Sequence, residues 1–461
     1  MTSVVSALSF VESASEDFYT NGVMNKSLLG TDGFIPVTRR LMYTLYTMAQ
    51  GEYKTPELVA RTLRVHPHGE SSVESALGSM AHPWRYPLLP IEFIGNAGTL
   101  VTPMAAPRYT SVSGNCYVGK FVRKLLPFVD RFVGESHDEE VDYMPMPYPV
   151  LLTSGFNQAV GTGISSQFIN HSFESVMALA YEMVNTAEGE KTLGTKFKNK
   201  LKPYYYGSGE MQSGLGLHDS RGTATYEADY EVVKAGGNKY NFIMRSSLGR
   251  IASEKVYAIL QEKYDKTFLG HMNQTNSNGL QVEITFVAGK ELRYDDIVNL
   301  LVNRLKLRRT LNVKQVALRR EIGSEPGTAM PEEVTQYQIM SDWLLNTYDL
   351  IKKSILHDLE VVRQHTFDTR LKLFVVRNTE EVVQQNKTGD YGTVAKHMGV
   401  SNEEIAPLVQ NIRFGALNEK KLLEAQKELI AQEAALNEKL ALGIRNILPI
   451  LDANMVEFNN A

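Results

Sequence analysis

Two long stretches without glycine or proline restrict the fold more than any other feature of this sequence. They cover residues 332–388 and residues 416–442. Because glycine and proline are the residues that most often end a helix, each stretch predicts one long helix. Apolar residues recur at helical spacing in the two stretches, at Leu344, Ile351, Ile355, Leu359 and Val362 and then at Leu422, Leu429 and Leu436. We therefore expect a long antiparallel coiled coil with a small helical knob at residues 394–414 between its helices.

The composition is that of a multidomain globular protein. The chain has 461 residues, and 43% of them are hydrophobic, which is enough for more than one hydrophobic core. We find neither a membrane-spanning run nor an export signal, so we expect no membrane association and a cytoplasmic location. The single cysteine, Cys116, cannot form an internal disulfide and fits a reducing compartment.

Basic residues are clustered although the net charge is −4. The clusters comprise Arg39, Arg40, Arg61, Arg64 and Arg108, residues 120–124, residues 196–202 and residues 304–320. The part of the chain after residue 332 is richer in acid. This distribution predicts one face that binds a polyanion and another that is turned away from it.

The N-terminal part has the pattern of a helix-turn-helix unit. Pro36 begins one helix, and residues 55–80 form two short helices separated by a tight Pro-His-Gly link. Prolines and glycines interrupt residues 83–107, so we expect Tyr109 on a loop or wing.

The middle of the chain predicts a separate α+β domain. After an amphipathic helix at residues 173–185, strand-like pieces at 240–244 and 280–287 alternate with helices at 253–263 and 295–306.

Tyr109 and Arg108 have the chemistry needed to break and reseal a phosphodiester bond. Resealing without an external energy source requires a covalent enzyme–phosphate link, because hydrolysis would discard the bond energy. A tyrosine hydroxyl, with an ordinary pKa of about 10, forms this link when a neighbouring cation or base and a metal-polarised phosphate activate it. The planar guanidinium of Arg108 can bind the same phosphate, and His68 and Arg39 can add further donors.

The same residues also have ordinary structural interpretations. Most tyrosines and histidines serve in packing, in helix capping or on the surface. His66 and His68 could also be two ligands of a metal site, although no further His, Asp or Cys lies at a recognisable ligand spacing. Val160, in an apolar run flanked by glycine, is most simply a residue of a core strand.

Taken in order, four motifs resemble those of the breakage-reunion core of type IIA DNA topoisomerases, the A subunits of gyrase and topoisomerase IV. They are Pro-Val-Thr-Arg-Arg at residues 36–40, His-Pro-His-Gly-Glu at 66–70, Ile-Gly-Asn-Ala-Gly at 94–98 and Ala-Ala-Pro-Arg-Tyr-Thr at 105–110. In length the chain is closest to the short DNA-cleaving subunit of some bacteriophage enzymes.

The resemblance implies an α+β multidomain fold with three kinds of domain. These are a winged-helix (helix-turn-helix) DNA-gate domain, an α/β tower domain and a long antiparallel coiled coil with a small helical C-gate knob. The implied boundaries are an N-terminal arm at 1–25, the winged-helix domain with the catalytic tyrosine at 26–170, the tower at 171–330, the coiled coil and C-gate at 331–450 and a C-terminal tail at 451–461.

The resemblance also implies roles for individual residues. Tyr109 is the expected nucleophile, which becomes linked to a 5′-phosphate of DNA, with Arg108, His68 and Arg39 as its catalytic partners. Val160 stands where the family has the isoleucine that wedges between base pairs and bends the gate DNA. The further residues expected to contact DNA are Lys26, Arg40, His66, Arg64 and Ser71, and no metal ligand is expected in this chain.

The activity implied is that of an ATP-dependent enzyme that passes one duplex through a transient double-strand break and so relaxes or decatenates DNA. The sequence carries no ATPase motif and no Toprim metal motif, so we expect Mg²⁺ and ATP to be bound mainly by a partner subunit. The expected partners are double-stranded DNA, a second copy of the chain held through the C-gate, and an ATPase/Toprim subunit.

Some positions depart from the family pattern. Ile35 replaces a family lysine, and Asn25 stands where the family has a catalytic arginine, with Lys26 beside it. These departures favour a divergent, viral-type member that acts in the cytoplasm of an infected host cell. They also support one alternative, a catalytically inactive winged-helix DNA-binding architectural protein, and the histidines His66 and His68 leave a second, an HxH metallohydrolase. A covalent DNA adduct would exclude the first alternative, and stoichiometric metal would support the second.

Overall fold

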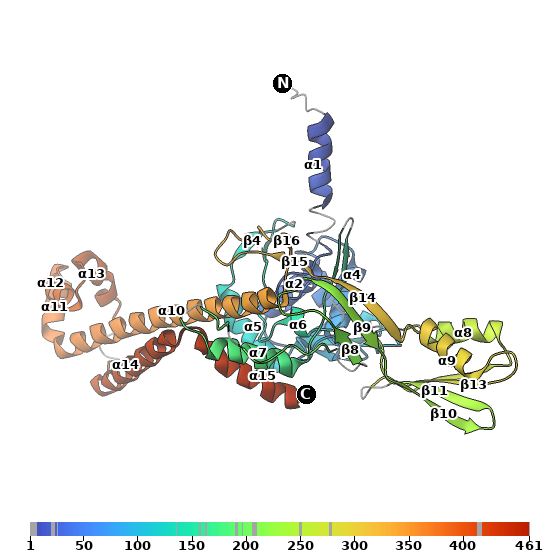
Figure 1. Cartoon of the computed structure of the whole chain (residues 1–461). Coiled ribbons are helices and arrows are strands. Elements are labelled where there is room, and N and C mark those ends of the chain that lie inside the picture. Colours follow the sequence, from blue (N-terminus) through green and yellow to red (C-terminus); the bar gives the residue numbers. More distant parts are fainter. Residues whose placement is uncertain are drawn as a thin grey trace. The chain divides into compact units, whose positions relative to one another are not determined.

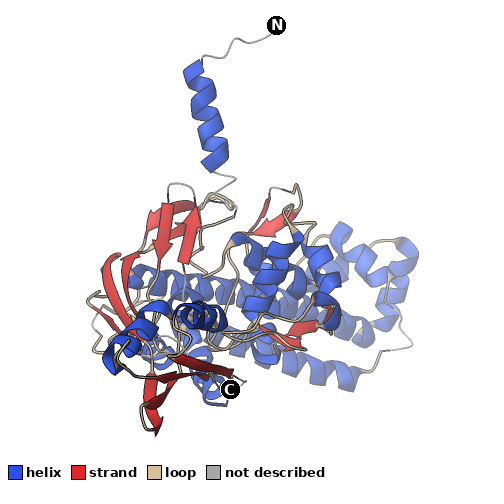
Figure 2. Cartoon of the chain, turned by 90° about the vertical axis from the view of Figure 1, so that its right-hand side faces the viewer, coloured by secondary structure: helices blue, strands red, loops and turns tan. Residues whose placement is uncertain are grey.

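The computed structural model describes residues 7–19, 24, 26–134, 136–155, 158–161, 164–189, 192–195, 197–204, 210–248, 251–275, 279–412 and 417–460. The chain separates into two compact units, Met1–Thr347 with Ile447–Ala461, and Tyr348–Asn446. Figure 1 labels the elements along the chain, and Figure 2 distinguishes its helices and strands by colour. The fold is of the α+β class, because helices accompany sheets whose described strands pair antiparallel. None of the described helices combines the length and the apolar character that a membrane span requires.

The N-terminal part of the first unit contains four helices and a small sheet. The helices are α1 (Ala7–Tyr19), α2 (Pro36–Thr47), α3 (Thr55–Thr62) and α4 (Glu70–Met80). Pro36 lies in the first turn of α2, where its missing N–H is not needed. Helices α3 and α4 pack against α2, which is almost entirely buried. The antiparallel sheet has the order β1-β3-β2, with β1 (Tyr53–Lys54), β2 (Ile91–Ile94) and β3 (Ser111–Gly114).

Several short elements follow or flank this sheet. They are η2 (Pro107–Tyr109), α5 (Cys116–Leu125), η3 (Leu126–Phe128), β4 (Arg131–Val133), β5 (Glu139–Val141) and α6 (Val150–Thr153). Strands β4 and β5 form one hairpin, and β15 (Val316–Arg319) forms a second with β16 (Met330–Glu333). A bridge between Gly30 and Leu318 joins the second hairpin to the turn before α2.

A five-stranded sheet extends through the first unit in the order β6-β7-β14-β9-β8. Its strands are β6 (Gln158–Gly161), β7 (Ile164–Gln167), β8 (Glu210–Ser213), β9 (Arg221–Glu227) and β14 (Arg308–Lys314). Because β7 pairs with β14, one sheet includes residues from both sides of the boundary expected at residue 170. Helix α7 (Phe173–Asn185) follows the β6–β7 hairpin and has the bounds that the sequence predicts.

A second sheet and two helices share a hydrophobic core, to which Tyr226 of β9 and Leu311 of β14 also contribute. The strand order is β10-β11-β13-β12, with β10 (Tyr230–Gly236), β11 (Lys239–Met244), β12 (Phe268–Asn273) and β13 (Val282–Val287). The helices are α8 (Ser253–Lys263) and α9 (Tyr294–Arg304). Phe242, Phe268 and Phe286 are fully buried in this core, together with Ile297 of α9. The alternation of buried and half-buried residues along β13 is the period-two pattern of a strand with one covered face.

Residues 448–460 form a packed helix, although we expected a C-terminal tail at residues 451–461. This helix, α15 (Leu448–Asn460), belongs to the first unit. The fully buried Asn454 donates to the carbonyl of Pro147 at 2.6 Å and accepts from the Tyr117 hydroxyl at 2.7 Å. The ring of Phe458 stacks on Phe173 of α7 with 4.6 Å between centroids. These contacts give α15 a structural role.

The second unit is helical. Helix α10 (Gln336–Arg377) runs into it from the first unit, and α11 (Thr379–Thr388), α12 (Gly392–Met398), α13 (Asn402–Gln410), α14 (Glu419–Ala441) and the short η5 (Gly443–Ile447) follow. Ion pairs Arg363–Glu433 and Arg377–Glu419, at 2.9 and 2.7 Å, join α10 to α14. Their opposite order along the two helices means that the helices are antiparallel. The helices between them enclose an apolar core that includes the buried Tyr391.

The first stretch without glycine and proline does not form the single helix that we predicted. Residues Met330–Glu333 pair with β15 as strand β16, so α10 begins only at Gln336. At Asn378 the backbone leaves the helical region, with φ −121° and ψ 37°, and the stretch is divided into α10 and α11. A short-range pattern could not reveal the strand pairing, because β15 lies in a different part of the sequence.

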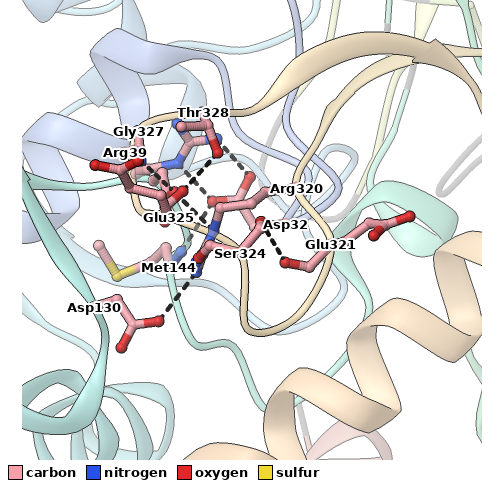
Figure 3. A network of polar contacts seen from close by, with 11 residues as sticks. Asp32, Arg39, Asp130, Met144, Arg320, Glu321, Ser324, Glu325, Gly327 and Thr328 are labelled. Atoms are coloured by element: carbon pink, nitrogen blue, oxygen red, sulfur yellow. Dashed lines mark hydrogen bonds and ion pairs between the residues drawn. The ribbon is translucent and has the colours of Figure 1, made fainter.

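A buried ion pair at the start of α2 ties distant segments together (Figure 3). The Arg39 guanidinium donates to both carboxylate oxygens of Asp32, from Nε at 2.7 Å and from Nη2 at 2.9 Å. The backbone N–H groups of Phe34, at 3.1 Å, and Met144, at 2.9 Å, donate to the same carboxylate. These hydrogen bonds offset the cost of removing both charges from water. The pair thereby fixes the start of α2 to the segment that follows β5.

Arg320 extends this arrangement to the loop between β15 and β16 (Figure 3). Its Nε lies 2.9 Å from a carboxylate oxygen of Asp142, and its Nη2 lies 3.2 Å from Asp130. The backbone N–H of Gly327 donates to Asp142 at 3.0 Å. The loop is thus attached to residues on both sides of the β4–β5 hairpin.

Replacing Arg39 by alanine should destabilise the first unit by about 3 kcal/mol, because it leaves the Asp32 carboxylate buried without its cation. Urea unfolding followed by circular dichroism measures this loss. Arg131→Ala, which breaks the exposed pair with Glu139, is the control and should cost less than about 1 kcal/mol. Equal effects of the two substitutions would contradict the structural role of the buried pair.

Candidate active site

Tyr109 ends the single 3₁₀ turn η2, immediately before β3. Its backbone N–H donates to the carbonyl of Ala106 at 2.9 Å. The next residue, Thr110, is buried, and its hydroxyl lies 2.8 Å from that of Thr55 at the start of α3. The backbone of Tyr109 is therefore anchored on both sides, whereas its side chain is 68% exposed. An exposed side chain on an anchored backbone suits a nucleophile that must meet a large substrate.

The glycine-rich motif at residues 94–98 lies against this turn. Gly95 has φ 114°, and a β-carbon there would approach a methyl group of Thr110 to 3.0 Å and the carbonyl oxygen of Tyr109 to 3.3 Å. The Asn96 side chain accepts from the N–H of Gly98 at 2.8 Å, and its carbonyl accepts from Ala105 at 2.9 Å. Two motifs that are separate in sequence thus form one substructure around Tyr109.

Arg108 is exposed and covers the Tyr109 ring. Its Cζ atom lies 4.7 Å from the ring centroid, within the range of a cation–π contact. The positive charge of Arg108 is thus available to a phosphate that approaches the Tyr109 hydroxyl.

The His-Pro-His-Gly turn holds His66 inside the protein and His68 at its edge. His66 is only 3% exposed, and its ring meets that of His68 edge-on with 4.6 Å between centroids. Its Nδ1 lies 3.1 Å from Arg40 Nη1, and its Nε2 lies 3.3 Å from the hydroxyl of Ser72. Because an arginine can only donate, Nδ1 must accept, and the proton of the neutral ring must be on Nε2.

The pKa of His66 is lowered to about 4, mainly by burial and then by the positive charges of Arg40, His68 and Lys26. His66 is therefore neutral at physiological pH. With protein partners on both ring nitrogens, it is poorly placed to serve as a metal ligand.

The two arginines of α2 both lie in the interior, although we expected them to project toward DNA. Arg39 pairs with Asp32, and Arg40 forms a two-point ion pair with Glu140 at 2.6 and 3.0 Å. Both guanidinium groups are less than a tenth exposed. Their expected roles at the phosphate stay predictions, and the geometry favours indirect roles.

Other residues expected to contact DNA lie on the surface. Lys26, Arg64 and Ser71 are exposed. Val160 is 65% exposed and pairs with Ser165 in the β6–β7 hairpin, so it is not the core strand residue of the simpler interpretation. Asn25, Thr162, Gly163 and Lys196 lie outside the described residues.

A cavity of about 520 Å³ lies between α4 and the segment that leads into the Tyr109 turn. Glu74 and Ser75 line it from α4, Met104 and Pro107 line it from the segment before Tyr109, and Trp84 also contributes. A concave surface with polar and apolar sides therefore lies beside the segment that leads into the Tyr109 turn.

Within the part of the chain that the structure describes, no three His, Cys, Asp or Glu side chains are grouped so that they could hold a metal ion.

Sequence reasoning missed Asp32, Glu140 and the Thr55–Thr110 contact. Glu140 is 100 positions from Arg40, so no local spacing could reveal their pairing. Asp32 lies just before the helix that the sequence predicts from Pro36, but its carboxylate reaches the backbone of Met144 only through the fold.

The stability of the protein should fall as the pH is lowered from about 6.5 toward 4. Burial lowers the pKa of His171, like that of His66, to about 4, so both rings stay neutral when folded while the unfolded chain takes up protons. Each contributes up to about 3 kcal/mol above pH 6.5, which is lost across this window. The melting temperature of His66→Gln should depend less steeply on pH than that of the wild type. The exposed His365→Gln is the control, and its melting temperature should have the same pH dependence as that of the wild type. An unchanged slope in His66→Gln would contradict the buried neutral state.

Comparisons with known proteins agree with this arrangement of motifs. The family model that describes the A subunits of DNA gyrase and topoisomerase IV matches residues 30–447. The DNA gyrase A subunit of Metamycoplasma arthritidis is 25% identical in a 439-residue alignment that covers 89% of this chain and 46% of that protein. The DNA topoisomerase 4 A subunit of Streptococcus pneumoniae is 22% identical in a 443-residue alignment that covers 89% of this chain and 50% of that protein. The chain spans about half the length of such relatives. It belongs to the family of DNA gyrase and topoisomerase IV A subunits.

Proposed function

We propose that this chain is the DNA-cleaving and religating subunit of an ATP-dependent type IIA DNA topoisomerase. The observation that carries the proposal is the exposed Tyr109 on its anchored turn, with the Arg108 guanidinium over its ring. The family match supports the same assignment.

The proposed reaction is a transesterification at Tyr109. The phenolate oxygen attacks the phosphorus of a DNA phosphodiester, the bond to the 3′ oxygen breaks, and that oxygen leaves as a 3′ hydroxyl after taking up a proton. Arg108 stabilises the added negative charge of the transition state. The 5′-phosphotyrosyl bond conserves the energy of the original bond, so attack by the 3′ hydroxyl reseals the strand. Two copies of the chain acting on opposite strands open a double-strand break for a second duplex.

The proposed assembly contains a second copy of the chain and an ATPase/Toprim subunit. Mg²⁺ and ATP are assigned to that partner, because this sequence carries neither an ATPase motif nor a Toprim metal motif. The C-gate contact is assigned to the helices around residues 379–410, which have their own apolar core. The cytoplasm, with its reducing conditions, suits the single exposed Cys116.

DNA contacts are proposed at two places. Lys26, Arg64 and Ser71 are exposed and would contact the phosphate backbone or base edges near the break. Val160, exposed on a hairpin, would wedge between base pairs and bend the duplex. Arg39 and Arg40 are buried and would act indirectly, by holding the elements around the site in position.

Tyr109→Phe should abolish covalent attachment to DNA without changing the fold. The assay uses end-labelled duplex with Mg²⁺ or Ca²⁺ and the ATPase/Toprim subunit, stopped with detergent. Wild type and Tyr181→Phe, which alters another exposed tyrosine, should both become attached to 5′ ends. An adduct that persists in Tyr109→Phe would refute the assigned nucleophile. If the wild type forms no adduct with an active partner, a non-catalytic DNA-binding role would replace this proposal.

Val160→Ala should reduce DNA bending, because removing two methyl groups from the wedge costs about 1–2 kcal/mol of apolar contact. Fluorescence energy transfer between dyes at the two ends of a bound duplex measures the bend. Val133→Ala is the control, since Val133 is 67% exposed against 65% for Val160. The wedge assignment fails if both variants bend DNA as the wild type does.

A further inference from the structure

We infer that Glu140 is a positioning residue for DNA cleavage, acting through Arg40 and His66 on the turn that carries His68. The inference rests on the proposed function. It concerns a side chain that none of the sequence motifs includes and that does not itself reach the surface.

The Glu140 carboxylate is committed to Arg40. Glu140 lies on β5 and is 4% exposed. Its Oε2 accepts from Arg40 Nε at 2.6 Å and its Oε1 from Nη2 at 3.0 Å, which is the two-point geometry that fixes a guanidinium in orientation. Gly134 leaves room for this carboxylate, because a β-carbon there would overlap with Oε1. The glycine at position 134 therefore leaves the space in the β4–β5 hairpin that the Glu140 carboxylate occupies.

The orientation of Arg40 determines the state of His66. With Nε and Nη2 held by Glu140, Nη1 points to Nδ1 of His66 at 3.1 Å. This donor keeps the histidine in the tautomer protonated at Nε2, which can donate to the Ser72 hydroxyl. Ser72 in turn donates to the carbonyl of Gly69 at 2.6 Å. The contacts thus form one continuous series from Glu140 to the backbone of the turn.

This series ends at the residues that would orient His68. Gly69 is the N-cap of α4 and directly follows His68, whose N–H donates to the His66 carbonyl at 2.7 Å. The two histidine rings are also in contact. Without the Glu140 carboxylate, the Arg40 charge would be buried without its partner and would move toward water. Nδ1 of His66 would then lose its donor, and the turn would lose its fixed position.

The test compares Glu140→Gln with Glu139→Gln, which alters the neighbouring exposed residue on the same strand. The full-length variants are combined with the ATPase/Toprim subunit, and the rate of covalent adduct formation on duplex DNA is measured in a single turnover. Displacement of a group at a reacting centre commonly costs about a hundredfold in rate, so we expect a loss of about tenfold to a hundredfold for Glu140→Gln. DNA affinity should be unchanged, and Glu139→Gln should cleave as the wild type does.

A second readout does not depend on activity. Nitrogen NMR of histidine-labelled protein should show His66, assigned with His66→Gln, as the Nε2–H tautomer in the wild type and as a mixture in Glu140→Gln. Ser72→Ala interrupts the same series at an exposed residue and should slow cleavage without loss of stability, which covers the case in which Glu140→Gln does not fold.

The outcomes distinguish a failure of the positioning role of Glu140 from a failure of the proposed function. A wild-type cleavage rate in folded Glu140→Gln, or in Ser72→Ala, would overturn the positioning role, as would an unchanged His66 tautomer. If the wild type itself forms no adduct, the proposed function fails, and the tautomer measurement still decides whether Glu140 controls His66.

Discussion

Two buried carboxylate–guanidinium pairs are the interactions on which the rest of the site depends. Adjacent arginines of α2 reach different partners, since Arg39 pairs with Asp32 and Arg40 pairs with Glu140. Burying a charge is expensive unless almost every hydrogen bond of the group is satisfied, so such pairs tolerate very little displacement. They fix α2 with respect to its preceding turn, to β5 and to the histidine turn. The two buried pairs therefore hold the elements around Tyr109 in fixed positions.

The site combines this rigid interior with an exposed reactive group. Thr110 is buried beneath Tyr109 and anchors its backbone, while the phenol ring and the Arg108 side chain are open to solvent. His66 is held neutral inside, and His68 lies beside it at the edge. The proposed nucleophile is thus open to a large substrate, and the groups that we propose to support it are already held in place by the fold.

The sequence predicted best the features that depend on neighbouring residues. Helices α7 and α8 have their predicted bounds. The apolar periodicity that indicates a helix and the residues that end it are close neighbours in the sequence, so both can be recognised without the fold. The prolines and glycines before Tyr109 predicted a loop or wing, and the structure has a single 3₁₀ turn there, Pro107–Tyr109. The burial of Arg39 and Arg40 could not be predicted, since their partners are brought to them only by the fold. For the same reason, strand β16 and the packed helix α15 were missed.

The central claim is that Tyr109 becomes covalently linked to DNA. The most direct measurement is mass spectrometry of the detergent-trapped wild-type complex after digestion with nuclease and protease. The account predicts one modified peptide, containing residues 105–110, with a nucleotide joined through its 5′ phosphate to the Tyr109 oxygen. A nucleotide on a different residue, or one joined through its 3′ phosphate, would contradict it.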